Sequence, residues 1–206
     1  MKYQEAENTK DNEGMIKFGV NLDIDKWSEQ IDELVGKLPE ELMCCSPKDS
    51  LQYVRQLIHG VTQPQIYLKV KGSWTGGHEE NLRFRAVNIN HGPSSSEWNC
   101  VGSSNWSLLR EAVRDVYDVD IYKNEGLWFA DVDFCLGRKI PIIWFNQREG
   151  DLVLLGPGLE HWVRAFGKAT QTAWNFGTID KLQFEEAIKR MNTNYFIKFK
   201  VSFINN

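Results

Sequence analysis

Short segments of alternating apolar and polar residues, separated by turn residues, dominate the chain between residues 65 and 176. Alternation with a period of two residues is typical of strands that bury one face. The predicted strands are 65–71, 84–90, 97–101, 140–145, 151–155, 161–166 and 172–176. Many short strands of this kind favour an antiparallel sandwich or barrel of the jelly-roll type. The expected fold class is therefore mainly β with flanking helices.

Helical patterns flank and interrupt these strands. We expect helices at residues 25–38, 46–60, 105–116 and 181–191. The second has Ser46 as its cap, Pro47 at the first position and Asp49 at the third, which is a typical helix start. Its inward face would carry Leu51, Val54, Leu57 and Ile58. His59 falls in its last turn, where the helix dipole favours a cation, so a catalytic role is not indicated.

Length and composition fit a single globular domain. The chain has 206 residues, a hydrophobic share of 42% and a net charge of −4. Residues 1–14 lack apolar periodicity, so we expect a flexible leader and a domain over 15–206, with strands at 16–22 and 195–203 near its ends. No apolar run reaches the length of a membrane span, and the acidic balance offers no basic surface for sequence-specific nucleic-acid binding.

The cysteines do not form a zinc-binding pattern. Cys44, Cys45, Cys100 and Cys135 include no pair separated by two residues, and adjacent cysteines cannot easily chelate one ion together. We interpret all of them as reduced, mostly buried thiols of an intracellular protein. No structural zinc ion is expected within this chain.

A candidate metal site begins in the sequence TGGHEEN, residues 75–81. His78 and Glu80 are two positions apart, so in an extended chain both side chains point to the same face. His161, which opens a predicted strand, is a third candidate ligand. Two histidines and one carboxylate on one face of a metal ion are the arrangement of non-haem Fe(II) oxygenases, which leaves positions open for substrate and oxygen.

Two alternatives remain open at this point. A histidine–carboxylate pair also arises by chance, so scattered surface histidines are the competing interpretation, although the chain has only four histidines to choose from. Lys69 shares a strand face with Tyr67, opposite Ile66 and Leu68. It could be solvated, or it could point into a pocket as the anchor of an anion.

Five segments, taken in order, resemble a known family. They are IKFGVNLDIDKW, QIYLKVKGSWTGGHEEN, VNINHGPSSSEW, GDLVLLGPGLEHWVRA and AWNFG. Together they resemble the JmjC domain of the UTX-type histone lysine demethylases. The resemblance implies a double-stranded β-helix, the cupin-like jelly roll, in agreement with the strand pattern.

The resemblance implies a dioxygenase that depends on Fe(II) and 2-oxoglutarate. The three candidate ligands would form the catalytic centre, with O2 consumed and ascorbate as a helpful reductant. Lys69 matches the lysine that pairs with the distal carboxylate of 2-oxoglutarate. Thr75 and Asn88 match further polar contacts to the same molecule. A cation suits the first role because a carboxylate entering a dry pocket needs a partner of opposite charge.

Further matches imply a pocket for a methylated lysine. Tyr67 would line it, with Ala173 and Trp174 on the strand at its other side. Ala86 stands where the family has serine, and Gln171 stands where it has asparagine. Both departures should loosen the grip on the methylated head, because one oxygen is lost and one amide lies a methylene further out.

The resemblance also implies a substrate and a location. The substrate would be trimethylated or dimethylated lysine 27 of the histone H3 tail, within chromatin and in the nucleus. The zinc-binding module that follows this domain in the family is absent from the chain. Two alternatives are a protein hydroxylase on the same scaffold and a non-catalytic chromatin-binding module. The intact ligands and Lys69 argue against the module, since binding alone has no physical need for them.

Overall fold

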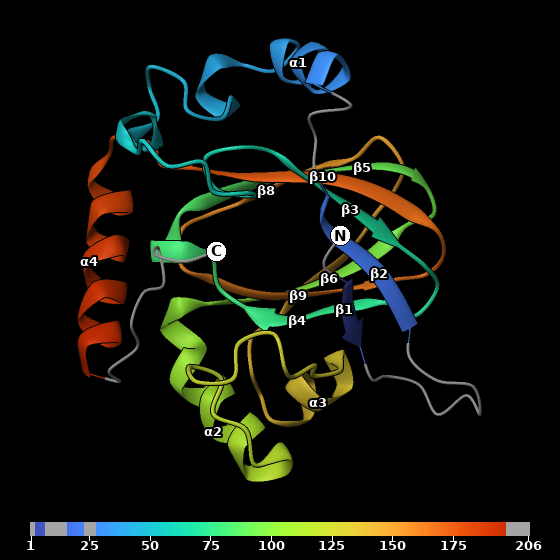
Figure 1. Cartoon of the computed structure of the whole chain (residues 1–206). Coiled ribbons are helices and arrows are strands. Elements are labelled where there is room, and N and C mark those ends of the chain that lie inside the picture. The colour runs from blue at the N-terminus through green and yellow to red at the C-terminus, as the bar shows by residue number, and fades with distance from the viewer. Residues whose placement is uncertain (1–2, 7–15, 23–27, 197–206) are drawn as a thin grey trace.

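The computed structural model consists of two facing β-sheets with helices packed outside them (Figure 1). It describes residues 3–6, 16–22 and 28–196. The expected fold class, mainly β with flanking helices in a jelly-roll arrangement, is confirmed. In this part of the chain, no helix combines the length and the apolar character needed to cross a membrane.

The larger sheet is antiparallel and has the strand order β1-β2-β3-β10-β5-β8. Its strands are β1 (Tyr3–Ala6), β2 (Ile16–Leu22), β3 (Gln65–Lys69), β5 (Arg85–Pro93), β8 (Leu152–Leu155) and β10 (Ala169–Phe176). The late strand β10 lies between two early ones, with Gln171 opposite Tyr67 on β3 and opposite Asn90 on β5. Side chains from distant parts of the sequence therefore meet on its inner face.

The smaller sheet has the order β4-β9-β6-β7, and its pairings are also antiparallel. Its strands are β4 (Trp74–His78), β6 (Ser96–Gly102), β7 (Ile143–Gln147) and β9 (Leu159–Ala165). In the pairing of β4 with β9, His78 lies opposite His161. The register of this sheet thus brings together two of the three candidate ligands.

Helices cover the outer faces of both sheets. They are α1 (Ser28–Gly36), α2 (Trp106–Tyr117), α3 (Val132–Gly137) and α4 (Lys181–Phe196), with short 3-10 helices η2 (Glu40–Leu42), η3 (Ser50–Tyr53), η4 (Asn81–Arg83) and η5 (Ser103–Asn105). In Figure 1, α1 lies outside the larger sheet, α2 and α3 lie outside the smaller one, and α4 stands at the side. Three of the four predicted helices are confirmed in α1, α2 and α4.

The apolar core is divided into layers. Ala86, Trp98, Leu155 and Val163 belong to a cluster between the sheets. A second cluster joins the outer face of β5 and β10 to residues from α1 and the segment that follows it. A third, built around Trp162 of β9, fills the space under α2 and α3. Because strand residues alternate between faces, each central strand supplies both the interior and an outer layer.

The predicted helix over residues 46–60 is wrong. Only the short η3 is present there, and it is followed by irregular chain in which Val54 is exposed. Asp49 accounts for the difference, because its carboxylate accepts a hydrogen bond from the backbone N–H of Gly177, 128 positions away at the end of β10. That long-range bond outweighs the local helix signal. His59 therefore lies outside any helix.

Other differences concern the ends of elements. The strand predicted at 140–145 begins at Ile143, because Ile140 packs into the cluster under α2 and α3. α3 itself was not predicted. The strands predicted at 84–90 and 97–101 extend further toward each other, since β5 continues to Pro93 and β6 begins at Ser96. These shifts leave the order of the elements unchanged.

Both ends of the chain are described only in part. α4 continues to Phe196, so the strand predicted at 195–203 is wrong at its start, and its remainder lies outside the described residues. Of the expected leader, residues 1–14, the structure describes only Tyr3–Ala6, as β1 paired with β2. The predicted start of the first helix, residue 25, also lies outside the described part.

α4 presents its polar side to the protein and its apolar side to solvent. The buried face carries Gln183, Glu186, Arg190 and Asn194. The exposed face carries Phe184, Ile188 and Met191. A helix on a protein surface normally shows the reverse pattern. Contacts between charged and polar groups must therefore hold α4 in place.

Candidate metal centre

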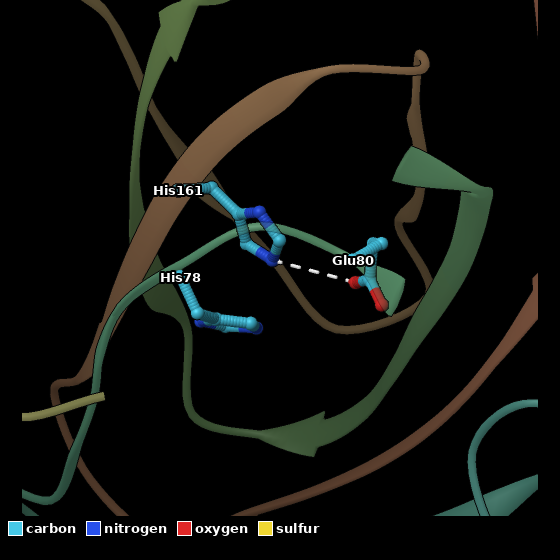
Figure 2. Close-up of side chains that lie close together, drawn as sticks. All are labelled: His78, Glu80 and His161. Carbon is cyan, nitrogen blue, oxygen red and sulfur yellow. Dashed lines mark ion pairs between the residues drawn. The ribbon is translucent and has the colours of Figure 1, made fainter. Parts of the chain in front are cut away.

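His78, Glu80 and His161 converge between the two sheets (Figure 2). One ligand atom from each lies within 4.8 Å of the others, and they form the only such group of histidine, cysteine and acidic side chains in the described residues. Nε2 of His161 lies 3.6 Å from Oε1 of Glu80. The two imidazole ring centroids are 4.2 Å apart. The structure thus brings the three predicted ligands together in one site.

The backbone selects which nitrogen of each imidazole is free. Nδ1 of His78 lies 2.8 Å from the carbonyl oxygen of Gly76, and Nδ1 of His161 lies 3.3 Å from that of Leu159. A carbonyl oxygen can only accept, so these contacts favour a proton on Nδ1 and a free lone pair on Nε2. Burial, with the nearby His78, holds the pKa of His161 well below its usual value. A neutral imidazole is the form that binds a metal ion.

Asn175 orients the carboxylate ligand. From β10 it donates a hydrogen bond through Nδ2 to Oε2 of Glu80 at 2.7 Å. This contact leaves Oε1 of Glu80 directed toward His161. The sequence analysis missed Asn175, although a signal was present. It lies two positions after Ala173 on a predicted strand, so both side chains were expected on the same face.

A cavity beside the metal centre collects most of the other predicted site residues. Seven of the eight line it, namely Tyr67, Lys69, Thr75, Ala86, Asn88, Gln171 and Ala173. They come from both sheets, on β3, β5 and β10 of the larger one and on β4 of the smaller one. Ile66 and Leu68 instead line a groove on the outer side, under α1. The alternation predicted for this strand is therefore confirmed.

Lys69 is a buried cation that forms no ion pair with the described residues. The residue is 5% exposed, and burial lowers the pKa of its ammonium group to about 7. Its Nζ lies 6.0 Å from the ring centroid of Tyr67, and no carboxylate among the described residues pairs with it. A buried charge without a partner is costly. The position is suited to an anionic ligand that enters the cavity.

Asn88 and Gln171 belong to a buried amide network centred on Gln147. Nε2 of Gln147 donates to Oδ1 of Asn88 at 3.1 Å. Nε2 of Gln171 donates to Oε1 of Gln147 at 3.0 Å and to Oγ of Ser96 at 3.2 Å. We expected the amide of Gln171 to reach a methylated head. Its nitrogen is instead bound within the protein, and only its oxygen lacks a partner in the described residues.

The structure also corrects the place of Trp174. The side chain does not line the cavity but packs with Val87 and Ile89 on the outer face of the larger sheet. Its Nε1 donates to the carbonyl oxygen of Leu42 at 2.8 Å. Adjacent strand residues point to opposite faces, so Ala173 and Trp174 cannot both face the same pocket. Ala173 is the one that does.

Comparison with known proteins identifies the family. Residues 65–176, more than half of the chain, match the family described as "JmjC domain, hydroxylase". The chain belongs to the JmjC domain family. It is 38% identical to human lysine-specific demethylase 6B over 186 residues, which cover 89% of this chain. It is 28% identical over 184 residues to lysine-specific demethylase jmjd-3.1 of Caenorhabditis elegans. The expected resemblance to UTX-type JmjC domains is confirmed.

These relatives are much longer proteins. The chain spans 11% of the length of the human protein and 17% of the length of the nematode one. A plant relative, lysine-specific demethylase ELF6 of Arabidopsis thaliana, is 25% identical over 165 residues, which are 12% of its length. The similarity therefore concerns a small part of each relative, and the family match over residues 65–176 includes the three candidate ligands.

Proposed function

We propose that this chain is the catalytic domain of a nuclear histone lysine demethylase that depends on Fe(II) and 2-oxoglutarate. Its substrate would be trimethylated or dimethylated lysine 27 of the histone H3 tail, within chromatin. One observation supports this proposal above all: a single cavity contains both the His78–Glu80–His161 centre and the unpaired cation Lys69. The first suits an iron ion and the second suits an acid bound beside it.

The residues fit both groups. Two imidazole nitrogens and one carboxylate oxygen make a donor set suited to Fe(II) with open positions. When bound, iron and 2-oxoglutarate supply the oxidising chemistry that uses O2 to hydroxylate an N-methyl carbon, which then leaves as formaldehyde. Lys69 would pair with the distal carboxylate of 2-oxoglutarate, and Thr75 and Asn88 would add hydrogen bonds to it. The chain itself binds and orients these molecules.

Tyr67, Ala86 and Ala173 would surround the methylated head of the substrate. A trimethylammonium group has no N–H to donate, so oxygen atoms and aromatic faces hold it. Burial, with a contribution from the charge of Glu80, raises the pKa of Tyr67, so its hydroxyl remains neutral. That hydroxyl accepts a hydrogen bond from the amide of Gln65. Ala86 presents no oxygen, and we expect weak discrimination among methylation states as a result.

Mass spectrometry of a trimethyl-lysine histone H3 peptide tests the proposal. The peptide would be incubated with the protein, Fe(II), ascorbate and 2-oxoglutarate, with the His78→Ala variant as the matched control. Loss of methyl groups together with release of formaldehyde supports a demethylase. A stable gain of one oxygen would identify a protein hydroxylase instead. An unchanged peptide that still binds the protein would identify a non-catalytic chromatin-binding module.

A further inference from the structure

Glu79 stands between two candidate metal ligands, yet its side chain points away from the metal centre. His78 and Glu80 line the cavity, while the intervening carboxylate contacts Arg190 of α4. The side chain of Glu79 is only 1% exposed. Whatever holds this carboxylate therefore also restrains the backbone that carries both ligands.

Two arginines hold it. Nε of Arg83 lies 3.0 Å from Oε2 of Glu79, and Arg190 of α4 contacts Oε1 from another side. Each arginine is anchored by a second carboxylate. Nη1 of Arg83 lies 2.8 Å from Oε2 of Glu186, and Nη2 of Arg190 lies 2.7 Å from Oε1 of Glu125. We call these five side chains the ionic cluster. They join α4 to the segment that carries the ligands.

The backbone just after Glu80 needs this support. Leu82 and Arg83 have φ angles of 47° and 57°, in the left-handed region that residues with a side chain rarely adopt. The backbone N–H of Arg83 donates to the carbonyl oxygen of Glu80 at 2.8 Å. From α4, Nε2 of Gln183 donates to the carbonyl oxygen of Arg83 at 3.1 Å. α4 thus holds the turn in a conformation that it would not keep alone.

We propose that α4 is a positioning element of the metal centre and that Arg190 acts through Glu79. Arg190 itself touches neither metal nor substrate. Its guanidinium fixes one side of the Glu79 carboxylate, and the backbone carries that restraint to His78 and Glu80 on either side. The inference rests on the proposed function, because it assigns further residues to the same metal site. It explains why α4 turns its polar face inward.

Metal affinity separates positioning from mere structural support. Loss of a structural contact lowers the stability of the fold but leaves the folded protein with its normal affinity. Loss of a positioning contact lowers the affinity of the folded protein itself. Mutation of groups that orient metal ligands typically weakens metal binding or activity by about 10- to 100-fold. The relevant measurement is therefore the Kd for a metal ion at a temperature where every variant is folded.

The experiment titrates the metal-free protein with Co(II) and follows the visible absorption of the bound ion. It compares the wild type with Arg190→Met, Glu79→Gln, the double variant and Arg190→Lys. The matched control is Lys181→Met, since Lys181 lies on the same helix, is 88% exposed and pairs only with Glu185 in the described residues. Thermal unfolding of each metal-free variant defines the range in which it is folded.

We expect Arg190→Met and Glu79→Gln each to weaken Co(II) binding by about 10- to 100-fold. The double variant should bind no more weakly than the weaker single variant, because both changes remove the contact between Arg190 and Glu79. Arg190→Lys should recover part of the affinity, and the Lys181→Met control should bind like the wild type. If Arg190→Met does not fold, Glu79→Gln, which keeps the size of the side chain, gives the same comparison.

Three outcomes would overturn the inference, each in a different way. Variants that unfold at lower temperature but bind Co(II) like the wild type would show a purely structural role, and the proposed function would stand without this addition. Additive effects in the double variant would equally exclude action of Arg190 through Glu79. A wild-type protein that does not bind Co(II) at all would remove the metal centre, and both proposals with it.

Discussion

The cavity and the ionic cluster lie on opposite sides of residues 78–83. They differ in whether their buried charged groups have partners of opposite charge. In the cluster, Arg83 and Arg190 each contact two carboxylates. In the cavity, Lys69 contacts none among the described residues. Desolvation costs free energy on both sides, but only the cluster offsets it from within the protein. A buried charge with partners thus indicates scaffolding, whereas a buried charge without one indicates a ligand site.

Removal of a metal ligand should have the largest effect. We expect His78→Ala, Glu80→Ala and His161→Ala each to reduce turnover below detection, because each takes one donor from a site that already has open positions. Metal content by elemental analysis should fall in parallel, while the far-ultraviolet circular dichroism stays like that of the wild type. Any of the three variants that keeps both its metal and its turnover would refute the assigned ligand set.

Lys69→Met should have the next largest effect. A carboxylate that loses a charged hydrogen-bond partner forfeits roughly 1.5–3 kcal/mol, so we expect 2-oxoglutarate to bind about 100-fold more weakly. Isothermal titration of the metal-loaded, oxygen-free protein measures this. Lys37→Met is the matched control, since Lys37 is a surface lysine whose side chain is 69% exposed. Equal affinities in the two variants would remove the role of Lys69.

The same variant tests the contrast between the two regions directly. Lys69→Met removes an unpaired buried charge, so the ligand-free protein should unfold at a higher temperature than the wild type. Arg190→Met removes a paired one and should unfold at a lower temperature, because it leaves buried carboxylates without a partner. Shifts in the same direction would mean that the two kinds of buried charge do not differ as described.

The affinity for 2-oxoglutarate should fall as the pH rises. With a pKa of about 7, free Lys69 carries its charge below that pH and must take up a proton to bind the anion above it. Above the pKa of Lys69 in the free protein, the affinity for 2-oxoglutarate should fall by up to about tenfold per pH unit. The fall ends at the higher pKa that Lys69 has in the complex. Other titratable groups facing the cavity are Tyr67, His78, Glu80 and His161. Lys69→Met therefore serves as the reference, and a parallel pH profile in that variant would assign the effect to another group.

The smallest effect concerns the methylated head. Ala86→Ser adds an oxygen to the cavity and should raise demethylation of the trimethyl peptide by a few fold, with little change in 2-oxoglutarate affinity. From sequence alone we expected Gln171, like Ala86, to loosen the grip on the methylated head. The amide nitrogen of Gln171 donates hydrogen bonds to Gln147 and Ser96. Gln171→Asn should therefore lower the free energy of unfolding by about 1 kcal/mol. Peptide kinetics measures the effect of Ala86→Ser, and thermal unfolding measures that of Gln171→Asn. An unchanged demethylation rate in Ala86→Ser would show that residue 86 does not bind the methylated head.

The alternation of side chains between the two faces of an extended chain explains most of what the sequence predicted correctly. A period of two places Lys69 with Tyr67, and His78 with Glu80, and each pair shares one face of the cavity. The same rule, applied strictly, excludes Trp174 from a pocket that Ala173 lines. The metal centre was thus predictable because His78 and His161 lie on paired strands and Glu80 follows His78 in a short motif.

Long-range polar contacts explain what the sequence did not predict. Asp49 is bound to Gly177, so a convincing local helix start did not become a helix. The polar face of α4 is buried because Glu79 and Arg83 lie beneath it. No local property of residues 181–191 indicates this, since their partners Glu79, Arg83 and Glu125 lie at least 65 positions earlier in the chain.

The position of α4 in the chain determines when the metal centre can form during synthesis. Arg83 and Glu186, which join the ligand-bearing turn to α4, are 103 residues apart. A chain emerges from the ribosome with its N-terminus first. His78 and Glu80 therefore emerge well before Asn175 and Arg190, the groups that orient them. Until then a metal ion meets ligands that are not yet held in place. On the proposed role of α4, a chain that has not yet added this helix should bind the ion about 10- to 100-fold more weakly than the complete domain.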